Sequence, residues 1–299
     1  MQKDSTLEAK LSLVREFQQF AESEGMVFEF QYDTLFGTCH GECYRSYENR
    51  DMPVYLLSTA KRTCFPDRQI ISIVQNKTTL KKFLKSYQEM KDKDPDLEHY
   101  IIKLHSYFAL AKNLLRPAHL RQNPAQLVST VAHEGLHATV FHYGYRKIHS
   151  NPRLEESLAE ASGYILLKEF GKATTNPLMG AQLVKEQLTE MRRTHNALSR
   201  WLSTFRAFYG DANTLNREEF EKKRAGMFAQ MERNFRKIIS NPLYLEAFDF
   251  GLNEGFNNAA LAFFTSYGAY FKALVDFYER CDNFGDFLKQ VNKLPGNFQ

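Results

Sequence analysis

Residues 123–143 read NPAQLVSTVAHEGLHATVFHY, and this stretch decides how the central part of the chain folds. Asparagine is a favoured N-cap residue and proline suits the first helical position, so the pair Asn123-Pro124 predicts a helix start. Four apolar residues then recur at a spacing of four, which puts them on one helical face that can pack into a core: Val128, Ala132, Leu136 and Val140. We therefore predict a helix over residues 124–143.

Other starts of the same kind organise the rest of the chain. Asn-Pro pairs recur at 151–152, 176–177 and 241–242, and Asp94-Pro95 is a related pair. Near the N-terminus, Ser5 and Glu8 have the spacing of a capping box. Together with the apolar patterns, these starts predict helices over residues 5–24, 95–115, 152–170, 177–208, 216–240, 242–250 and 256–281.

Strand signals are confined to the first third of the chain. Short apolar or β-branched runs bounded by turn residues predict strands at 27–30, 54–57 and 70–74. A small sheet followed by a long helical region is an α+β arrangement, mainly α.

Composition and charge exclude several classes of protein. Of 299 residues, 43% are hydrophobic and 25% are charged, which excludes fibrous, collagen-like and globally disordered chains. The formal net charge is only +4, so we expect no nucleic-acid partner. The longest uncharged stretch near the C-terminus, Phe256 to Phe271, is interrupted by polar residues and is too short for a membrane span. Without a signal-peptide core, and with four cysteines, we expect a cytoplasmic protein.

The motif His133-Glu134-Gly135-Leu136-His137 carries the chemistry. Residues four apart share one helical face, so His133 and His137 can bind a single metal ion. Glu134 projects beside them, where it can take a proton from water activated by the metal. A match of this kind also arises by chance, so two helical histidines that are merely solvated or hydrogen-bonded remain an alternative.

A catalytic zinc ion usually has three protein ligands and one open position. Eighteen residues separate His137 from Glu156, which stands in the run LEESLAEA at residues 154–161. This spacing resembles that of the gluzincin metallopeptidases, which include thermolysin-like enzymes and related aminopeptidases, and the Glu-Ser-Leu-Ala-Glu run is similar to the Glu-Gly-Leu-Ala-Glu form of that clan. The resemblance covers about residues 124–170 and implies that Glu156, on the next helix, completes the zinc site.

The resemblance also assigns a role one helical turn further along. It implies that Glu160 hydrogen-bonds a ligand histidine and orients it. Gly163 continues this face and would let the two helices approach closely. As an alternative, Glu155, Glu156 and Glu160 could form a solvated acidic face near a helix N-terminus, where carboxylates are favoured.

Rival zinc ligands fit the sequence less well. A metzincin would have glycine at position 140 and histidine at 143, but the chain has Val140 and Tyr143, so that class is rejected. His149, in the connection between the two helices, is a weaker alternative to Glu156. The chain has no Gly-x-Met-Glu-Asn segment, so an exopeptidase is unsupported by motif. Three residues are candidates for a group that stabilises the transition state: His195, Tyr209 and Tyr267.

A second cluster consists of Cys39, His40 and Cys43, with Cys64 further along. It has enough ligands for a structural zinc ion, but the usual second paired half is missing. Buried free cysteines are the favoured interpretation.

We predict a zinc-dependent metallopeptidase with one Zn²⁺ per chain, bound by His133, His137 and Glu156. Glu134 would be the general base, and the partner would be a peptide or protein substrate. The alternatives are a catalytically inactive helical metal-binding or interaction protein, and a metallohydrolase of a non-peptide amide. We expect an α+β part with the metal-site helices in residues 1–170. The resemblance further implies that the small sheet lies beside the helix over residues 124–143. It also implies that residues 171–299 form a helical part and the other wall of the cleft, in a separate or a continuous domain.

Overall fold

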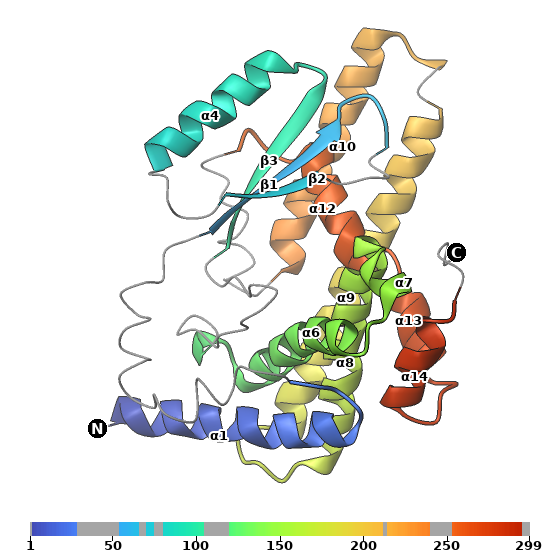
Figure 1. Ribbon diagram of the computed structural model, residues 1–299. Coiled ribbons are helices and arrows are strands. Elements are labelled where there is room, and N and C mark those ends of the chain that lie inside the picture. Colours follow the sequence, from blue (N-terminus) through green and yellow to red (C-terminus); the bar gives the residue numbers. More distant parts are fainter. Residues whose placement is uncertain are drawn as a thin grey trace. The chain divides into compact units, whose positions relative to one another are not determined.

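The computed structural model describes residues 2–28, 54–65, 70–74, 80–104, 120–211, 214–239 and 253–294. These residues form helices and one small antiparallel sheet, which confirms the predicted α+β, mainly α class (Figure 1). By its contacts the chain divides into two compact units, each built from separate segments. Unit 1 comprises Met1–Asp51, Ser106–His195 and Tyr270–Gln299, and unit 2 comprises Met52–His105 and Asn196–Ala269. The predicted parts 1–170 and 171–299, and the placement of the sheet beside the helix, stay predictions.

Unit 1 is built around two helices that pack along each other. Its elements are α1 (Gln2–Ser23), α6 (Pro124–His142), α7 (Arg146–His149), α8 (Pro152–Ala173), the first part of α9 (Ala181–Gly210), α13 (Phe271–Tyr278) and α14 (Phe284–Val291). Helices α6 and α8 lie side by side (Figure 1), α1 packs against both, α13 packs against α8, and α14 packs against α13. The core of the unit therefore surrounds the helix that carries the His-Glu-x-x-His motif.

The contact between α6 and α8 is unusually close at one point. The predicted core stripe of α6 is fully buried at each of its four positions, Val128, Ala132, Leu136 and Val140. A β-carbon at Gly163 of α8 would lie 2.8 Å from the Ser129 carbonyl oxygen of α6, nearer than real β-carbons come to such an atom. This confirms that Gly163 lets the two helices approach.

Unit 2 contains the sheet. Strands β1 (Val54–Lys61), β2 (Ile70–Val74) and β3 (Leu97–Leu104) pair antiparallel in the order β2-β1-β3. The unit also contains α4 (Leu80–Lys93), the second part of α9, α10 (Arg217–Ile238) and α12 (Asn258–Gly268). Helix α12 packs on β1 and β3, where Ala60, Tyr100 and Ile102 share a core with the alanines of α12.

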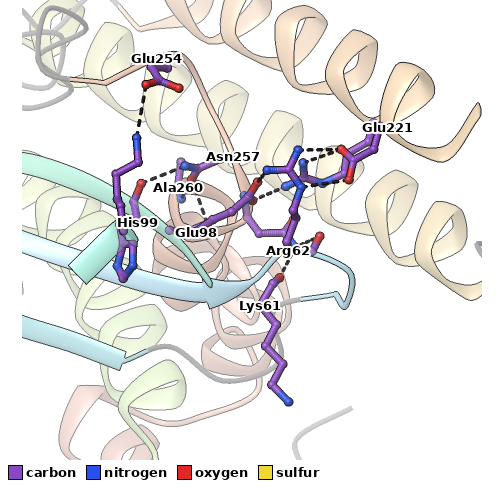
Figure 2. A network of polar contacts seen from close by, with 12 residues as sticks. Lys61, Arg62, Glu98, His99, Glu221, Glu254, Asn257 and Ala260 are labelled. Carbon is purple, nitrogen blue, oxygen red and sulfur yellow. Dashed lines mark hydrogen bonds and ion pairs between the residues drawn. The ribbon is translucent and has the colours of Figure 1, made fainter. Parts of the chain in front are cut away.

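A network of polar side chains ties the elements of unit 2 together (Figure 2). The Asn258 side-chain amide donates to the carbonyl oxygens of Lys61, Arg62 and Cys64 at 2.7, 3.1 and 2.8 Å. Glu98 of β3 accepts from the Asn258 backbone N–H at 2.9 Å and from the Arg224 guanidinium of α10. The network therefore joins the end of β1 to β3, α10 and α12.

One predicted helix is wrong, because residues 97–104 form strand β3. Pro95 stands in a turn, closed by the Leu97 N–H donating to the Asp94 carbonyl at 3.1 Å, and does not begin a helix. All eight residues of the segment LEHYIIKL pair with β1. The rest of the predicted helix, residues 105–115, lies outside the described residues.

Other predicted elements differ in extent. The single helix predicted over 256–281 is two helices, α12 and α13, because the Tyr270 N–H donates to the Ser157 hydroxyl at 3.3 Å. Val27 and Phe28 form no strand, since the Thr139 side chain of α6 hydrogen-bonds the N–H and carbonyl of Val27. Helices α4 and α14 were not predicted. The predicted helix 242–250 and residues 29–30 lie outside the described residues.

Within the part of the chain that the structure describes, no helix combines the length and the apolar character that crossing a membrane requires.

Candidate metal centre

Two capped helices carry the candidate site. Helix α6 begins with a capping box, in which Asn123 Oδ1 accepts from the Gln126 N–H at 2.9 Å and Gln126 Oε1 accepts from the Asn123 N–H at 3.4 Å. Helix α8 begins at Asn151, whose Oδ1 accepts from the Leu154 N–H at 3.1 Å. Both Asn-Pro starts are therefore confirmed. Because the start of each helix is fixed, the face on which each polar residue lies is fixed as well.

The structure brings His133, His137 and Glu156 together. One nitrogen or oxygen atom from each lies within 4.8 Å of those of the other two. The Nε2 atoms of His133 and His137 lie 3.5 and 3.8 Å from Glu156 Oε2. The three side chains are 15%, 17% and 27% exposed, so the cluster is mostly buried but still open to solvent on one side.

Two other carboxylates hold the second nitrogen of each imidazole. His133 Nδ1 lies 3.3 Å from Glu160 Oε1, and His137 Nδ1 lies 2.9 Å from Glu155 Oε1. A carboxylate accepts the proton of Nδ1, so the lone pair of Nε2 is left for another partner. Both imidazoles therefore present a metal-binding nitrogen to the space beside Glu156.

A single metal ion fits this set of donor atoms. Glu156 Oε2 is buried and has no hydrogen-bond partner among the described residues, a costly arrangement for a carboxylate oxygen. Tetrahedral zinc with bonds of about 2.0–2.1 Å holds its ligand atoms about 3.3 Å apart, close to the 3.5 and 3.8 Å measured here. Two imidazole nitrogens and one carboxylate oxygen form one of the donor sets of catalytic zinc sites.

Opposite charges dominate the electrostatics of the cluster. Burial lowers the pKa of His133 and of His137, but the neighbouring carboxylates, Glu156 foremost, outweigh burial and raise both, that of His133 well above its usual value. Burial raises the pKa of Glu156, and the two imidazoles outweigh it and hold this pKa below its usual value. The carboxylates therefore create a site that favours positive charge, whether from protons or from a divalent cation.

Glu134 is placed to exchange protons beside the cluster. Its Oε1 lies 3.9 Å from His133 Nε2, and its side chain is 19% exposed. Burial raises the pKa of Glu134, an effect that the charges of His133 and His137 reduce without cancelling. A carboxylate with a raised pKa is a better proton acceptor than an ordinary glutamate.

Glu155 also contacts the cluster, a role that no sequence pattern predicted. Its Oε1 contacts His137, and its Oε2 lies 3.2 Å from His149 Nδ1. His149, the rival ligand, thus contacts Glu155, and its side chain is 58% exposed. The sequence contained one indication of this role, because Glu155 is adjacent to Glu156 in the same helical turn. Only the packing of the helices shows which carboxylate faces which imidazole.

The three candidates for a transition-state group have other partners. His195 Nε2 lies 3.3 Å from Glu160 Oε2, and the His195 side chain is buried. In unit 2, the Tyr209 hydroxyl donates to Asn258 Oδ1 at 2.6 Å and accepts from Arg224 Nε at 2.9 Å. Tyr267 packs its ring on Phe263.

Cys39, His40 and Cys43 of the second predicted cluster lie outside the described residues. Cys64 is exposed and its thiol is free. The favoured interpretation of buried free cysteines is therefore wrong for Cys64, which is free but not buried. The alternative of a structural zinc ion is not tested.

A mainly helical α+β fold that brings two histidines and one glutamate together defines the general class of proteins that could bind one metal ion at such a site. The comparison with protein families is more specific. The family described as "Putative aminopeptidase" matches residues 81–297, and the chain belongs to this peptidase-like family. The matched range contains every residue of the candidate metal centre. No curated protein and no solved structure matches the chain significantly.

Proposed function

We propose that the protein is a zinc-dependent aminopeptidase of gluzincin type, which removes residues from the free N-terminus of peptides. The main support for the proposal is that His133 Nε2, His137 Nε2 and Glu156 Oε2 converge on one point. Glu156 Oε2 is buried and has no hydrogen-bond partner among the described residues, and Glu134 lies beside the three ligands. Membership of the aminopeptidase-like family supports a peptide substrate and cleavage at the N-terminus.

Each residue of the centre has a distinct part in this proposal. His133, His137 and Glu156 would hold the zinc ion, while Glu160 and Glu155 orient the two imidazoles through their Nδ1 atoms. A bound zinc ion would supply Lewis acidity, which lowers the pKa of a water molecule and polarises a carbonyl group.

Glu134 would move the proton. It accepts a proton from the water that attacks the peptide carbonyl and passes it to the amine that leaves. Its raised pKa, which burial causes, makes the carboxylate a better proton acceptor than an ordinary glutamate. In this proposal no other titratable residue of the cluster takes part in the proton transfer.

The first test is metal content, measured by elemental mass spectrometry on protein purified without a histidine tag. We expect about one zinc ion per chain in the wild type and a sharp loss in His137→Ala and Glu156→Ala. The control is His142→Ala, which removes an exposed histidine of the same helix. A wild type that carries no zinc and cannot be loaded with it contradicts the proposal.

The second test is substrate preference, measured with aminoacyl-aminomethylcoumarin substrates and their N-acetylated counterparts. An aminopeptidase cleaves the substrates with a free amine and spares the blocked ones. Cleavage of blocked or internal peptide bonds alone would indicate an endopeptidase. Zinc binding without cleavage of any member of a peptide library would leave an inactive metal-binding protein or a hydrolase of other amides.

A further inference from the structure

Glu160 is shared between two histidines. Its Oε1 lies 3.3 Å from Nδ1 of His133, and its Oε2 lies 3.3 Å from Nε2 of His195, which comes from α9. Glu160 is 9% exposed and His195 is 6% exposed, so solvent has little access to this contact. Each oxygen of one carboxylate is thus engaged by a different imidazole, one of which belongs to the candidate metal centre.

The His195 ring is itself held in one orientation. It stacks on the Phe271 ring of α13, with centroids 3.8 Å apart and planes 12° from parallel. Among the described residues, its Nδ1 has no hydrogen-bond partner. The tautomer with the proton on Nε2 therefore matches the surroundings, because that proton points at Glu160 and the nitrogen without a partner carries none.

A buried carboxylate needs such a second partner. Loss of His195 would remove the donor that contacts Glu160 Oε2 at 3.3 Å, so the desolvation of that oxygen would be less compensated and the carboxylate would be less restrained about its terminal bond. A donor at each oxygen fixes the plane of the carboxylate and, through it, the orientation of the His133 ring. The direction in which His133 Nε2 points then depends on His195.

We infer that His195 is a positioning residue of the metal centre, which acts on His133 through Glu160 and strengthens metal binding without touching the metal. The inference rests on the metal site of the proposed function and is independent of whether the protein cleaves peptides.

The other ligand histidine provides an internal comparison. His137 contacts Glu155, which contacts His149, so the same order of imidazole, carboxylate and imidazole occurs twice. The outer histidine differs in burial, because the His149 side chain is 58% exposed and that of His195 is 7% exposed. Water can take the place of His149 at Glu155, but it has little access to the position of His195. The buried contact of His195 with Glu160 should therefore contribute more to zinc affinity than the exposed contact of His149 with Glu155.

The test is the zinc dissociation constant of the full chain, measured by competition with a chromophoric chelator at fixed pH. We expect His195→Leu to weaken zinc binding roughly tenfold, at the lower end of the range for residues that orient a ligand. His195→Gln keeps an N–H donor and should bind zinc within about threefold of the wild type. His149→Leu should weaken binding less than His195→Leu does.

A spectroscopic measurement separates positioning from general packing. In protein loaded with Co²⁺, the visible absorption bands report the ligand geometry, and we expect them to change in His195→Leu and to be restored in His195→Gln. The matched control is Val184→Ala, which trims a buried residue of the same helix that packs at Gly171 of α8. It should leave both zinc affinity and the spectrum unchanged.

Each outcome decides the matter. Unchanged affinity and spectrum in His195→Leu overturn the inference while leaving the metal site intact, and so does an equal loss in His195→Gln or Val184→Ala. A wild type that binds neither metal overturns the proposed function and this inference together. Circular dichroism of the metal-free proteins checks folding, and His195→Phe, which keeps the ring stacked on Phe271, replaces His195→Leu if that variant does not fold.

Discussion

At the scale of single residues, Glu134 is the group on which the proposed reaction depends. Glu134→Gln keeps the shape of the side chain but removes its ability to accept a proton. We expect zinc content to stay at the wild-type level and peptide hydrolysis to fall by roughly 10²–10⁴-fold, the usual contribution of a general base. Elemental mass spectrometry and a fluorogenic peptide assay on the same preparation measure both quantities.

The control for this variant is Glu169→Gln, a change to a glutamate of α8 whose partner is Lys172 near the end of the helix. It should retain both zinc and activity. Wild-type rates in Glu134→Gln would show that Glu134 is not the proton acceptor.

The raised pKa values of His133 and His137 predict how zinc binding depends on pH. In the metal-free protein, the protonated imidazoles of His133 and His137 contribute to the free energy of unfolding. This contribution is fully present below the unfolded pKa of about 6.5 and is lost as pH rises through the raised folded pKa. Zinc needs neutral imidazoles, so its contribution grows over the same interval. The difference in Tm between zinc-loaded and metal-free protein should therefore increase as pH rises from the unfolded pKa of about 6.5 through the raised folded pKa values.

Calorimetry with equimolar zinc or with a chelator measures this difference. His142→Gln, which alters an exposed histidine outside the cluster, should show the same increase with pH. A Tm difference that is flat or that shrinks as pH rises is incompatible with protons and zinc competing for the same two imidazoles.

Most residues of the candidate cluster could be grouped from the sequence alone, and the reason is physical. His133, His137 and Glu156 could be grouped because helical periodicity and a family spacing relate residues close in sequence. Glu155 and His195 could not, because the first required knowing how α8 is rotated against α6. The second required knowing that α9 brings a residue 35 positions away against Glu160. Their roles, like those of the metal ligands, stay predictions.

At the scale of elements, the contact of α6 with α8 depends on Gly163. In Gly163→Ala, the added carbon would meet the Ser129 carbonyl, a backbone atom that moves only with its helix. We expect a loss of about 1–3 kcal/mol in the free energy of unfolding, as for other overpacked cores. Zinc affinity should fall as well, because the two helices carry different ligands. Urea unfolding and chelator competition measure the two effects.

Gly226→Ala is the matched control, because this glycine also lies inside a helix, α10, and a β-carbon there would meet nothing within 4 Å. It should be neutral or stabilise the protein by up to about 1 kcal/mol. If Gly163→Ala were equally harmless, the close approach of the two helices would not limit the stability of unit 1.

Helix starts were predicted well where the asparagine side chain caps the helix, as at Asn123 and Asn151. The same reasoning was wrong at Asp94-Pro95, because proline also suits a turn. The pairing of residues 97–104 with β1 could not be inferred from the neighbouring sequence, because β1 is distant in the chain. Helix α14 was missed since it is only eight residues long. Local signals therefore identified the helices that hold the metal cluster but not the pairing that builds the sheet.

At the scale of the whole molecule, Asn258 joins parts of unit 2 that are far apart in the chain. Asn258→Ala removes the donors to three carbonyl groups and takes away the nearer acceptor of the Tyr209 hydroxyl, which leaves only the Arg62 carbonyl at 3.4 Å among the contacts described. We expect the free energy of unfolding to fall by about 2–4 kcal/mol. Amide hydrogen exchange should accelerate in β1 and α12.

Asn196→Ala, at an exposed position of α9, should change the free energy of unfolding by less than about 0.5 kcal/mol. Protection of β1 that is the same in Asn258→Ala as in the wild type would mean that the sheet is held by its core and not by the polar network.

The interleaving of the two units has a consequence for synthesis on the ribosome. Phe271, whose ring stacks on His195, and the buried residues of α14 come about a hundred residues after the metal-cluster helices, which end at Ala173. At about 5–20 residues per second, translation needs several seconds to cover this stretch. Until then α8 lacks the packing of α13 and His195 lacks its stacking partner, so we expect the metal centre to gain its full support only after Phe271 has been synthesised.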